Sequence, residues 1–300
     1  MRNQIVEQMN LAVVPHATSV AACALLGERR RGLFRSDLAL RMQQLVDLLR
    51  MMSVKLTPAL LHDEGDFSDS IASLLRMDLI RAAPDPRGEI LFFEPGKRRA
   101  LDIYRNILLH YLAAPSFLAL ELLRGGSRED VLARLYDWLD AFRGEFFSAR
   151  GQELSAHVAA FLSHFEALGW IERGTGALRA TELGEPHLAF LAEQMRAVLE
   201  SYYLAVSAMA QQGEPLTRRS LEKRVSEQYQ RAALLGEVEL PEANNAVTFG
   251  NALDLLIRRE VLAAAPRSGP DRRDALYGRG PAWDELAPLR ERLATALRSR

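Results

Sequence analysis

The sequence predicts a mainly α-helical fold, because most of it places apolar residues three or four positions apart. Short segments rich in proline and glycine interrupt this pattern, and each contains a brief run of β-prone residues typical of a small hairpin. The apolar pattern also recurs with a spacing of 91 residues. Together these observations predict helices that alternate with three small β-hairpins.

The 91-residue spacing indicates a weak internal repeat. In each copy an apolar helical stripe runs into an apolar pair and then into a polar, turn-rich segment, at 81–94, 172–181 and 263–278. The recurring residues are Ile71, Leu162 and Leu253; Leu74, Phe165 and Leu256; Leu79, Trp170 and Val261; and Ile80, Ile171 and Leu262. Self-similarity at a fixed spacing favours duplication of one supersecondary unit. Chance likeness between helix–turn patterns is the alternative.

Helices are expected on both sides of each hairpin. The first runs from about Ser36 to Met51, where Ser36 or Asp37 could cap it, and similar helices follow Ser127 and Thr217. Further helices follow the hairpins near 97–123, 186–210 and 282–298. The order helix, helix, hairpin, helix is the pattern of a winged-helix module. We therefore expect a helical array of winged-helix-like units with small β-hairpins, over 36–124, 127–213 and 217–300.

The composition is that of an ordinary globular protein, with 26% charged and 48% hydrophobic residues. The net charge of −1 gives no overall attraction to nucleic acid or to an anionic membrane. Cys23 is the only cysteine, which excludes an intrachain disulfide and favours a reducing compartment. Because Cys23 lies in the apolar stretch AACALL, we expect a buried, unreactive thiol.

The sequence does not predict a targeting or transmembrane segment. Residues 1–10, MRNQIVEQMN, lack the long apolar run of a signal peptide. The most apolar stretch, 107–123, contains His110, Pro115 and Glu121. A transmembrane helix needs about 20 mostly apolar residues. We therefore expect this stretch to form a buried helix or one that touches a membrane surface.

Sequence motifs for catalysis and metal binding are absent. None of the six histidines begins a His-x-x-x-x-Asp or a His-Glu-x-x-His sequence, and no phosphate-binding loop, dinucleotide fingerprint or nucleophile elbow occurs. His62 and Asp66 have the spacing of a metal-binding pair, but HDEGDFSD is typical of a solvated acidic loop. His157 and His164 lack a third ligand nearby. We expect no metal ion, no cofactor and no catalytic residue in this chain.

Three clusters of basic residues lie at the edges of the expected helices. They are Arg29–Arg31 with Arg35, then Lys97–Arg99, and then Arg218 and Arg219 with Lys223 and Arg224. Such clusters can hold phosphates, lipid headgroups or an acidic partner. Solvated helix ends are the alternative interpretation of all three.

Residues 97–123 read KRRALDIYRNILLHYLAAPSFLALELL, in which Tyr104, Arg105 and Asn106 are followed by His110 and an apolar run. This stretch resembles part of the bacterial membrane-bound glycerol-3-phosphate 1-O-acyltransferases, where Tyr-Arg-Asn or Tyr-Lys-Asn precedes a histidine and an apolar run. Residues 10–38, 127–147 and 220–256 resemble other parts of the same family's C-terminal region, in the same order.

The resemblance implies the C-terminal, non-catalytic region of an enzyme that transfers an acyl group from acyl-CoA or acyl-carrier protein to glycerol 3-phosphate, the first step of phospholipid synthesis. In that family a His with an Asp five positions on supplies general-base catalysis. This motif lies upstream of the region matched here and does not occur in this chain. Residues 1–35 would then be the junction segment to a catalytic domain outside this chain.

On this interpretation the partner is the acyltransferase catalytic domain, with the membrane surface as a second partner and a peripheral location on the cytoplasmic face of the inner membrane. The candidate contact residues are Tyr104, Arg105, Asn106 and His110. Asn106 and His110, four apart, would share a helix face, either as a structural pair or as part of the contact.

The alternative hypothesis is a stand-alone winged-helix regulator that binds DNA. The near-zero net charge opposes it, because duplex binding depends on phosphate neutralisation. We therefore expect no nucleic-acid partner.

Overall fold

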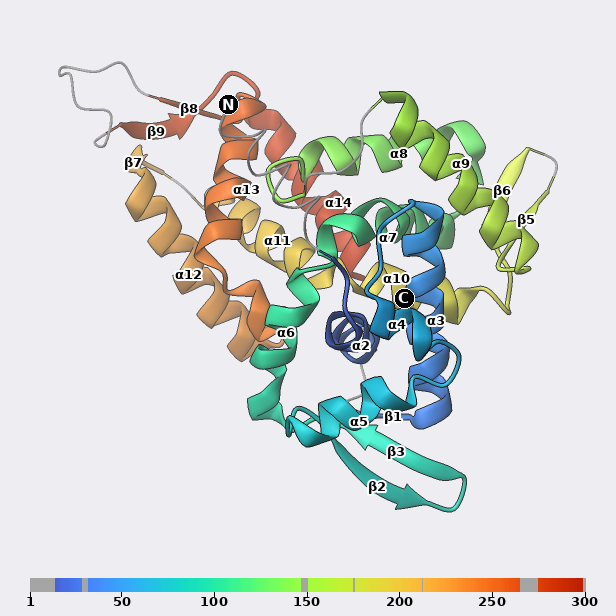
Figure 1. The fold of residues 1–300 in the computed structure, drawn as a ribbon. Helices are drawn as coiled ribbons and strands as arrows, with labels where there is room; N and C mark the ends of the chain where they lie inside the picture. Colours follow the sequence, from blue (N-terminus) through green and yellow to red (C-terminus); the bar gives the residue numbers. More distant parts are fainter. Residues whose placement is uncertain are drawn as a thin grey trace. The chain divides into compact units, whose positions relative to one another are not determined.

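The computed structural model describes residues 14–28, 32–146, 151–174, 176–211, 213–264 and 275–298. Over these ranges the chain is mainly helical, with three small antiparallel sheets (Figure 1), which confirms the predicted fold class at this level. The first thirteen residues of the expected junction segment, the cluster Arg29–Arg31 and residues 265–274 lie outside the described residues.

The chain divides into two compact units. Unit 1 comprises Met1–Asp140 and Phe146–Gln194, and unit 2 comprises Ala141–Glu145 and Met195–Arg300. The helices of unit 1 are α2 (Ala17–Leu26), α3 (Arg35–Met51), α4 (Pro58–His62), α5 (Ser68–Arg76), α6 (Arg98–Asn106), α7 (Leu109–Arg124), α8 (Arg128–Ala141, whose last residue belongs to unit 2), α9 (Gly151–Ala167) and α10 (Glu185–Glu193). Those of unit 2 are α11 (Arg196–Ala210), α12 (Arg218–Leu235), α13 (Ala246–Arg258) and α14 (Leu286–Arg298).

Each sheet has three strands, and in each the third strand in sequence lies in the middle. The first sheet pairs β1 (Gly32–Phe34), β3 (Gly88–Phe92) and β2 (Arg81–Asp85); the second pairs β4 (Gly126–Ser127), β6 (Ala177–Ala180) and β5 (Ile171–Arg173); the third pairs β7 (Leu216–Thr217), β9 (Leu276–Arg279) and β8 (Leu262–Ala264). The middle strand of each sheet has a residue that pairs with both neighbouring strands, namely Leu91, Leu178 and Tyr277.

The first strand of each sheet is missing from the sequence prediction, which anticipated only hairpins. Strands β1, β4 and β7 have three, two and two residues, too few to display the alternation by which a strand is recognised. Each leads directly into a helix whose first residue is arginine, at Arg35, Arg128 and Arg218. The three sheets thus share one local arrangement of strand and helix.

The residues of the 91-residue pattern form part of the core. All twelve are buried, from Ile71, Leu162 and Leu253 on the helix before each hairpin to Ile80, Ile171 and Leu262 at the start of the hairpin. Burying a large apolar side chain contributes about 1.5–3 kcal/mol, so these positions stabilise each copy in the same way.

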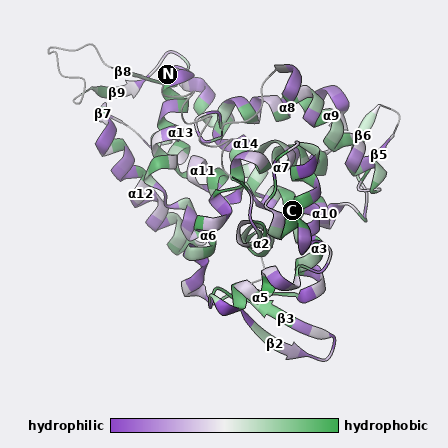
Figure 2. Cartoon of the chain, in the orientation of Figure 1, coloured by the Kyte–Doolittle hydropathy of each residue, from purple (hydrophilic) through white to green (hydrophobic). Residues whose placement is uncertain are grey.

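Helix α2 lies at the centre of unit 1, where it contacts α6, α3 and α5 (Figures 1 and 2). His16 caps its first turn, since the imidazole accepts from the Ser19 backbone N–H while the Ser19 hydroxyl accepts from that of His16. Every residue from Ser19 to Leu26 is buried. Gly27 follows, and a Cβ there would lie 1.9 Å from the Gln194 side-chain nitrogen and 2.7 Å from the Phe190 ring, so a larger residue would require both side chains to shift.

The long helix expected near 97–123 is in fact two helices, α6 and α7, whose axes differ by 94°. Backbone N–H groups of Ile107 and Leu108 bond to carbonyls three residues earlier, which tightens and ends α6. The helix expected near 186–210 is likewise divided into α10 and α11. No described helix alone meets the length and hydropathy of a membrane span, whereas the bent pair α6 and α7 meets them together.

A buried carboxylate joins α7 to α8 in unit 1. Glu121 is 0% exposed and accepts from Trp138 Nε1 at 2.6 Å, from Arg134 Nε and from Arg124 Nη1 at 3.3 Å. Phe117 stacks on the Trp138 ring at 5.8 Å. Two arginines therefore compensate the charge of Glu121, which would otherwise be costly to bury.

Helix α11 is the central helix of unit 2, and α12, α13 and α14 contact it. Its buried Glu200 pairs with Arg196 at 2.7 Å and accepts from the backbone N–H groups of Glu239 and Leu240. The short segment Ala141–Glu145 belongs to this unit, and its Phe142 ring lies 4.4 Å from that of Tyr202. This packing makes a segment distant in sequence part of the core of unit 2.

Candidate functional site

Two of the four predicted contact residues face the central helix of unit 1. The Tyr104 ring meets His16 edge-on, with centroids 5.9 Å apart, and the Cys23 thiol donates to the Arg105 carbonyl at 3.8 Å. Cys23 is buried, as predicted, and burial raises the pKa of its thiol to about 12, which disfavours the reactive thiolate. Tyr104 and Arg105 therefore hold α6 against α2.

The Arg105 side chain is only 1% exposed. Its Nη2 donates to Asp102 Oδ1 at 2.5 Å, while its Nε and Nη1 have no hydrogen-bond partner within the described residues. A guanidinium held this way is a positioned internal group rather than an open binding site, because a ligand could reach it only after α6 moved.

Asn106 and His110 do not share a helix face, which corrects the prediction from their spacing. Asn106 is exposed at the end of α6 and donates to Asp102 Oδ2 at 3.3 Å. His110 lies beyond the 94° bend on α7, with its ring centroid 3.8 Å from that of Tyr111. The bend separates residues that a continuous helix would have placed together.

The accessible side of α6 carries a different set of residues. Arg99, Ile103 and Asn106 are exposed, and their spacing of four and three places them along one helix face. Ile103 is 64% exposed, which is high for a large apolar side chain. We call these three residues the α6 stripe.

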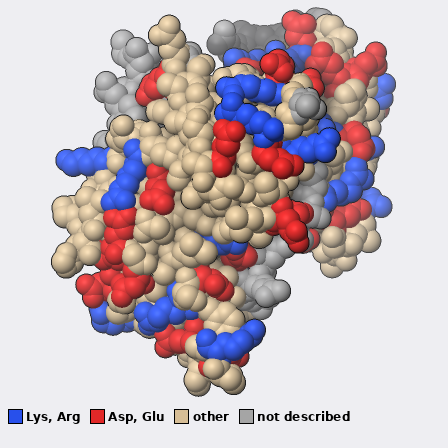
Figure 3. All heavy atoms as spheres, turned by 90° about the vertical axis from the view of Figure 1, so that its right-hand side faces the viewer, with Lys and Arg blue, Asp and Glu red and all other residues tan. Residues whose placement is uncertain are grey.

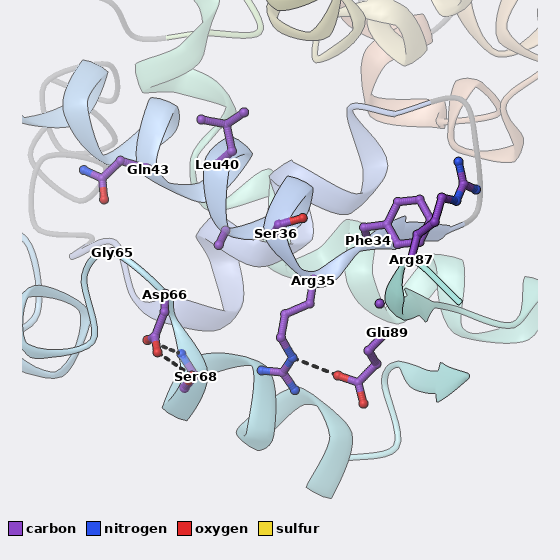
Figure 4. Close-up of a pocket in the computed structure, with 12 residues that line it drawn as sticks. Phe34, Arg35, Ser36, Leu40, Gln43, Gly65, Asp66, Ser68, Arg87 and Glu89 are labelled. Atoms are coloured by element: carbon purple, nitrogen blue, oxygen red, sulfur yellow. Dashed lines mark hydrogen bonds and ion pairs between the residues drawn. The ribbon is translucent and has the colours of Figure 1, made fainter. Parts of the chain in front are cut away.

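A pocket of about 700 Å³ lies elsewhere in unit 1, between the start of α3, the loop before α5 and the β2–β3 turn (Figure 4). Its apolar lining residues come from α3 and the strand before it. The lining residues are Phe34, Arg35, Ser36, Ala39, Leu40, Gln43, Gly65, Asp66, Ser68, Arg87, Gly88 and Glu89.

The charged groups of this pocket already have partners. Arg35 Nε pairs with Glu89 at 2.8 Å, and Arg87 pairs with Asp85 and covers the Phe34 ring at 4.8 Å. The Ser68 N–H and hydroxyl donate to Asp66 and lower its pKa. With two acidic and two basic residues in its lining, the pocket has no net charge that would select an ionic ligand.

Surface charge does not mark a nucleic-acid interface on the face shown in Figure 3. Basic and acidic side chains alternate over that face, with no broad area of one sign. Lys97 of the second predicted basic cluster pairs with Asp78 at 2.6 Å, and Arg218 of the third pairs with Asp254 and Glu222. At least one basic residue of each of these two clusters is therefore compensated by neighbouring carboxylates.

The other candidates from the sequence are not assembled into a site. Among the described residues, no three His, Cys, Asp or Glu side chains come together in a way that could hold a metal ion. His62 is exposed, and Asp66 is engaged by Ser68 instead. The pocket could not be predicted from the sequence, because it is formed by three segments up to 55 residues apart, none of which contains a recognisable motif.

Comparison with known proteins identifies the family of this chain, which the geometry of the site does not. The family model for the glycerol-3-phosphate acyltransferase C-terminal region matches residues 3–265. The glycerol-3-phosphate acyltransferase of Aeromonas hydrophila is 26% identical over 217 residues, which cover 70% of this chain and 27% of the relative. That of Pseudomonas fluorescens strain SBW25 is 24% identical over 266 residues, 86% of this chain and 32% of the relative.

The Shewanella loihica glycerol-3-phosphate acyltransferase is 25% identical over 252 residues, 83% of this chain and 31% of the relative. The chain thus spans about a third or less of the length of the curated relatives it matches. The matched segment includes all the residues that the sequence analysis singled out on α6 and α7.

Proposed function

Because the chain belongs to the glycerol-3-phosphate acyltransferase C-terminal region family, we propose that it is a non-catalytic helical region that supports an acyltransferase catalytic domain. That domain would transfer an acyl group from acyl-CoA or acyl-carrier protein to glycerol 3-phosphate, in phospholipid synthesis. The match over residues 3–265 carries the proposal. The lack of a His-x-x-x-x-Asp sequence supports the non-catalytic part, since in the family that the chain resembles this pair supplies the general base.

The proposal includes how the chain is built and where it acts. Three winged-helix-like modules, near 36–124, 127–213 and 217–300, form the scaffold, with residues 1–35 as the junction to the catalytic domain. The repeated strand order supports this division. The partner is the catalytic domain, and the location is the cytoplasmic face of the inner membrane, with the membrane surface as a further contact. The alternative of a DNA-binding regulator is not favoured, since the family match concerns an acyltransferase.

We place the contact with the catalytic domain on α6 and the start of α7. The α6 stripe offers an apolar side chain beside a basic one, and Asn106 adds an amide. Tyr104 and Arg105 position this face by holding α6 on α2, and His110 lies at the bend that sets the direction of α7.

The purified chain is expected to show no glycerol-3-phosphate acyltransferase activity by itself. The reason is that it lacks the His-x-x-x-x-Asp sequence that would supply the general base for the substrate hydroxyl. The measurement is product formation from acyl-CoA and glycerol 3-phosphate by mass spectrometry, with a mock purification as the control. Turnover above that control would contradict the non-catalytic assignment.

Replacing Ile103 by aspartate should weaken association with an acyltransferase part by about tenfold to a hundredfold, the worth of one buried apolar side chain. The partner is the upstream part of the Pseudomonas fluorescens relative, and affinity is measured by calorimetry. Leu183→Asp is the matched control, since Leu183 is 62% exposed on the same unit but away from α6. If both variants weaken the affinity equally, while their free energies of unfolding stay unchanged, the α6 stripe is not the contact with the catalytic domain.

A further inference from the structure

His187, at the start of α10, makes a set of contacts within unit 1 that the proposed function does not use. Its Nδ1 lies 3.0 Å from Arg41 Nη1 and 2.7 Å from Gln44 Nε2, both on α3. Its ring stacks on Trp170, with centroids 4.6 Å apart and planes 4° from parallel. The imidazole is half-buried at this point.

Arg41 is itself held in place from three sides. It pairs with Glu28 at 2.8 Å, covers the Phe190 ring at 4.6 Å and donates to the Pro186 carbonyl at 3.4 Å. An arginine restrained in this way cannot turn away from His187 without losing these contacts.

These contacts define the protonation state of the ring. A guanidinium can only donate, so Nδ1 must accept, and the proton of a neutral imidazole is then on Nε2. A second proton would have to enter at Nδ1, which faces the Arg41 donor. The doubly protonated ring could not accept from Arg41, could bond Gln44 only if the amide turned its oxygen toward the ring, and would carry a charge beside another positive charge.

We propose that His187 is a proton-sensitive clasp, which holds α10 against α3 while its imidazole is neutral and releases it when the imidazole is protonated. The clasp lies wholly within unit 1 and joins α3, the first helix of one repeated copy, to α10, the first helix after the hairpin of the next. The packing of α10, and of Trp170 just before β5, would therefore depend on pH.

The electrostatic surroundings of His187 are simple. From α3 the charged group facing it is Arg41, with Glu28 behind Arg41, and from the β5 side the neighbour is the uncharged Trp170 ring. Burial, and then the charge of Arg41, lower the pKa of His187 below its usual value near 6.5. No carboxylate bonds to the ring among the described residues, so nothing there offsets the repulsion.

The direction of the pH effect follows from this lowered pKa. An unfolded or opened His187 takes up its proton at a higher pH than the clasped one. The clasp is therefore fully effective above about pH 6.5 and weakens as the pH falls below that value, until the clasped ring itself is protonated. Between the two pKa values the open population should rise by up to about tenfold for each pH unit.

Two measurements on the full chain test the clasp. Nuclear magnetic resonance titration should give a pKa below 6.5 for His187, and Arg41→Gln should raise it. Hydrogen exchange, corrected for the intrinsic pH dependence of exchange, should show α10 becoming less protected between pH 7 and pH 5. His187→Asn keeps an acceptor near the Nδ1 position but does not titrate, so its α10 should lose this pH dependence.

His62→Gln is the control, because His62 is exposed on α4 and makes no bond to α10. A His187 pKa at or above 6.5 in the wild-type chain would overturn the proposal. So would unchanged α10 protection over this pH range, or the same pH dependence in His187→Asn as in the wild-type chain. The titration of the wild-type chain decides the matter even if a variant fails to fold.

Discussion

Replacing Glu121 by alanine is expected to lower the free energy of unfolding by about 3–5 kcal/mol, the usual cost of removing one partner from a buried ion pair. Glu121 is fully buried and is the shared acceptor for Arg124, Arg134 and the Trp138 indole. Alanine would leave these donors without their carboxylate and a cavity between α7 and α8. Urea denaturation followed by circular dichroism measures the loss.

Two further variants make the Glu121 result specific. Glu121→Gln keeps an acceptor for the indole but removes the charge, so it should cost less than Glu121→Ala. Glu129→Ala, at an exposed position in the first turn of α8, should change the unfolding free energy by less than about 0.5 kcal/mol. If Glu121→Ala behaves like Glu129→Ala, the buried network does not stabilise unit 1.

Replacing Gly184 by alanine should cost about 3 kcal/mol, at the upper end of overpacking effects. A Cβ at Gly184 would lie 2.0 Å from the Trp170 carbonyl oxygen, and backbone cannot give way as a flexible side chain can. A Cβ at Gly280, just after β9 in unit 2, would lie at the same 2.0 Å from the Glu260 carbonyl oxygen. We therefore expect Gly280→Ala to destabilise unit 2 by a similar amount.

Gly96→Ala is the matched control for both glycine variants, since nothing lies within 4 Å of a Cβ at Gly96. Thermal unfolding of all three variants, compared with the original chain, measures the effect. A melting temperature for Gly184→Ala equal to that of Gly96→Ala would mean that the hairpin base can move aside, and that the close approach is not required.

The repeated core was predictable because it depends on periodic apolar residues. Ile71, Leu162 and Leu253 have the same spacing, and each is buried in the structure. The division of the 97–123 segment was not predictable, because Ile107 and Leu108 are ordinary helix-compatible residues with no proline or glycine beside them. A change of direction determined by packing leaves no local signal.

The sites were less predictable than the fold for the same reason. Tyr104 and Arg105 were found from a sequence resemblance, but their packing against α2 depends on a helix more than 70 residues earlier. The contact between Arg41 and His187 joins residues 146 positions apart, and neither belongs to a recognisable motif. Side chains brought together by tertiary packing alone can be found only in the folded chain.

The assignment of Ala141–Glu145 to unit 2 has a consequence for dissecting the protein. The residues on both sides of this segment, up to Asp140 and from Phe146, belong to unit 1, so unit 2 is encoded discontinuously. A fragment that begins at Met195 would lack Phe142, the ring that covers Tyr202, and the Ala141 carbonyl that accepts from Arg258. Such a truncation would expose the Tyr202 ring. Joining residues 141–145 to the fragment through a designed linker would restore the missing contacts.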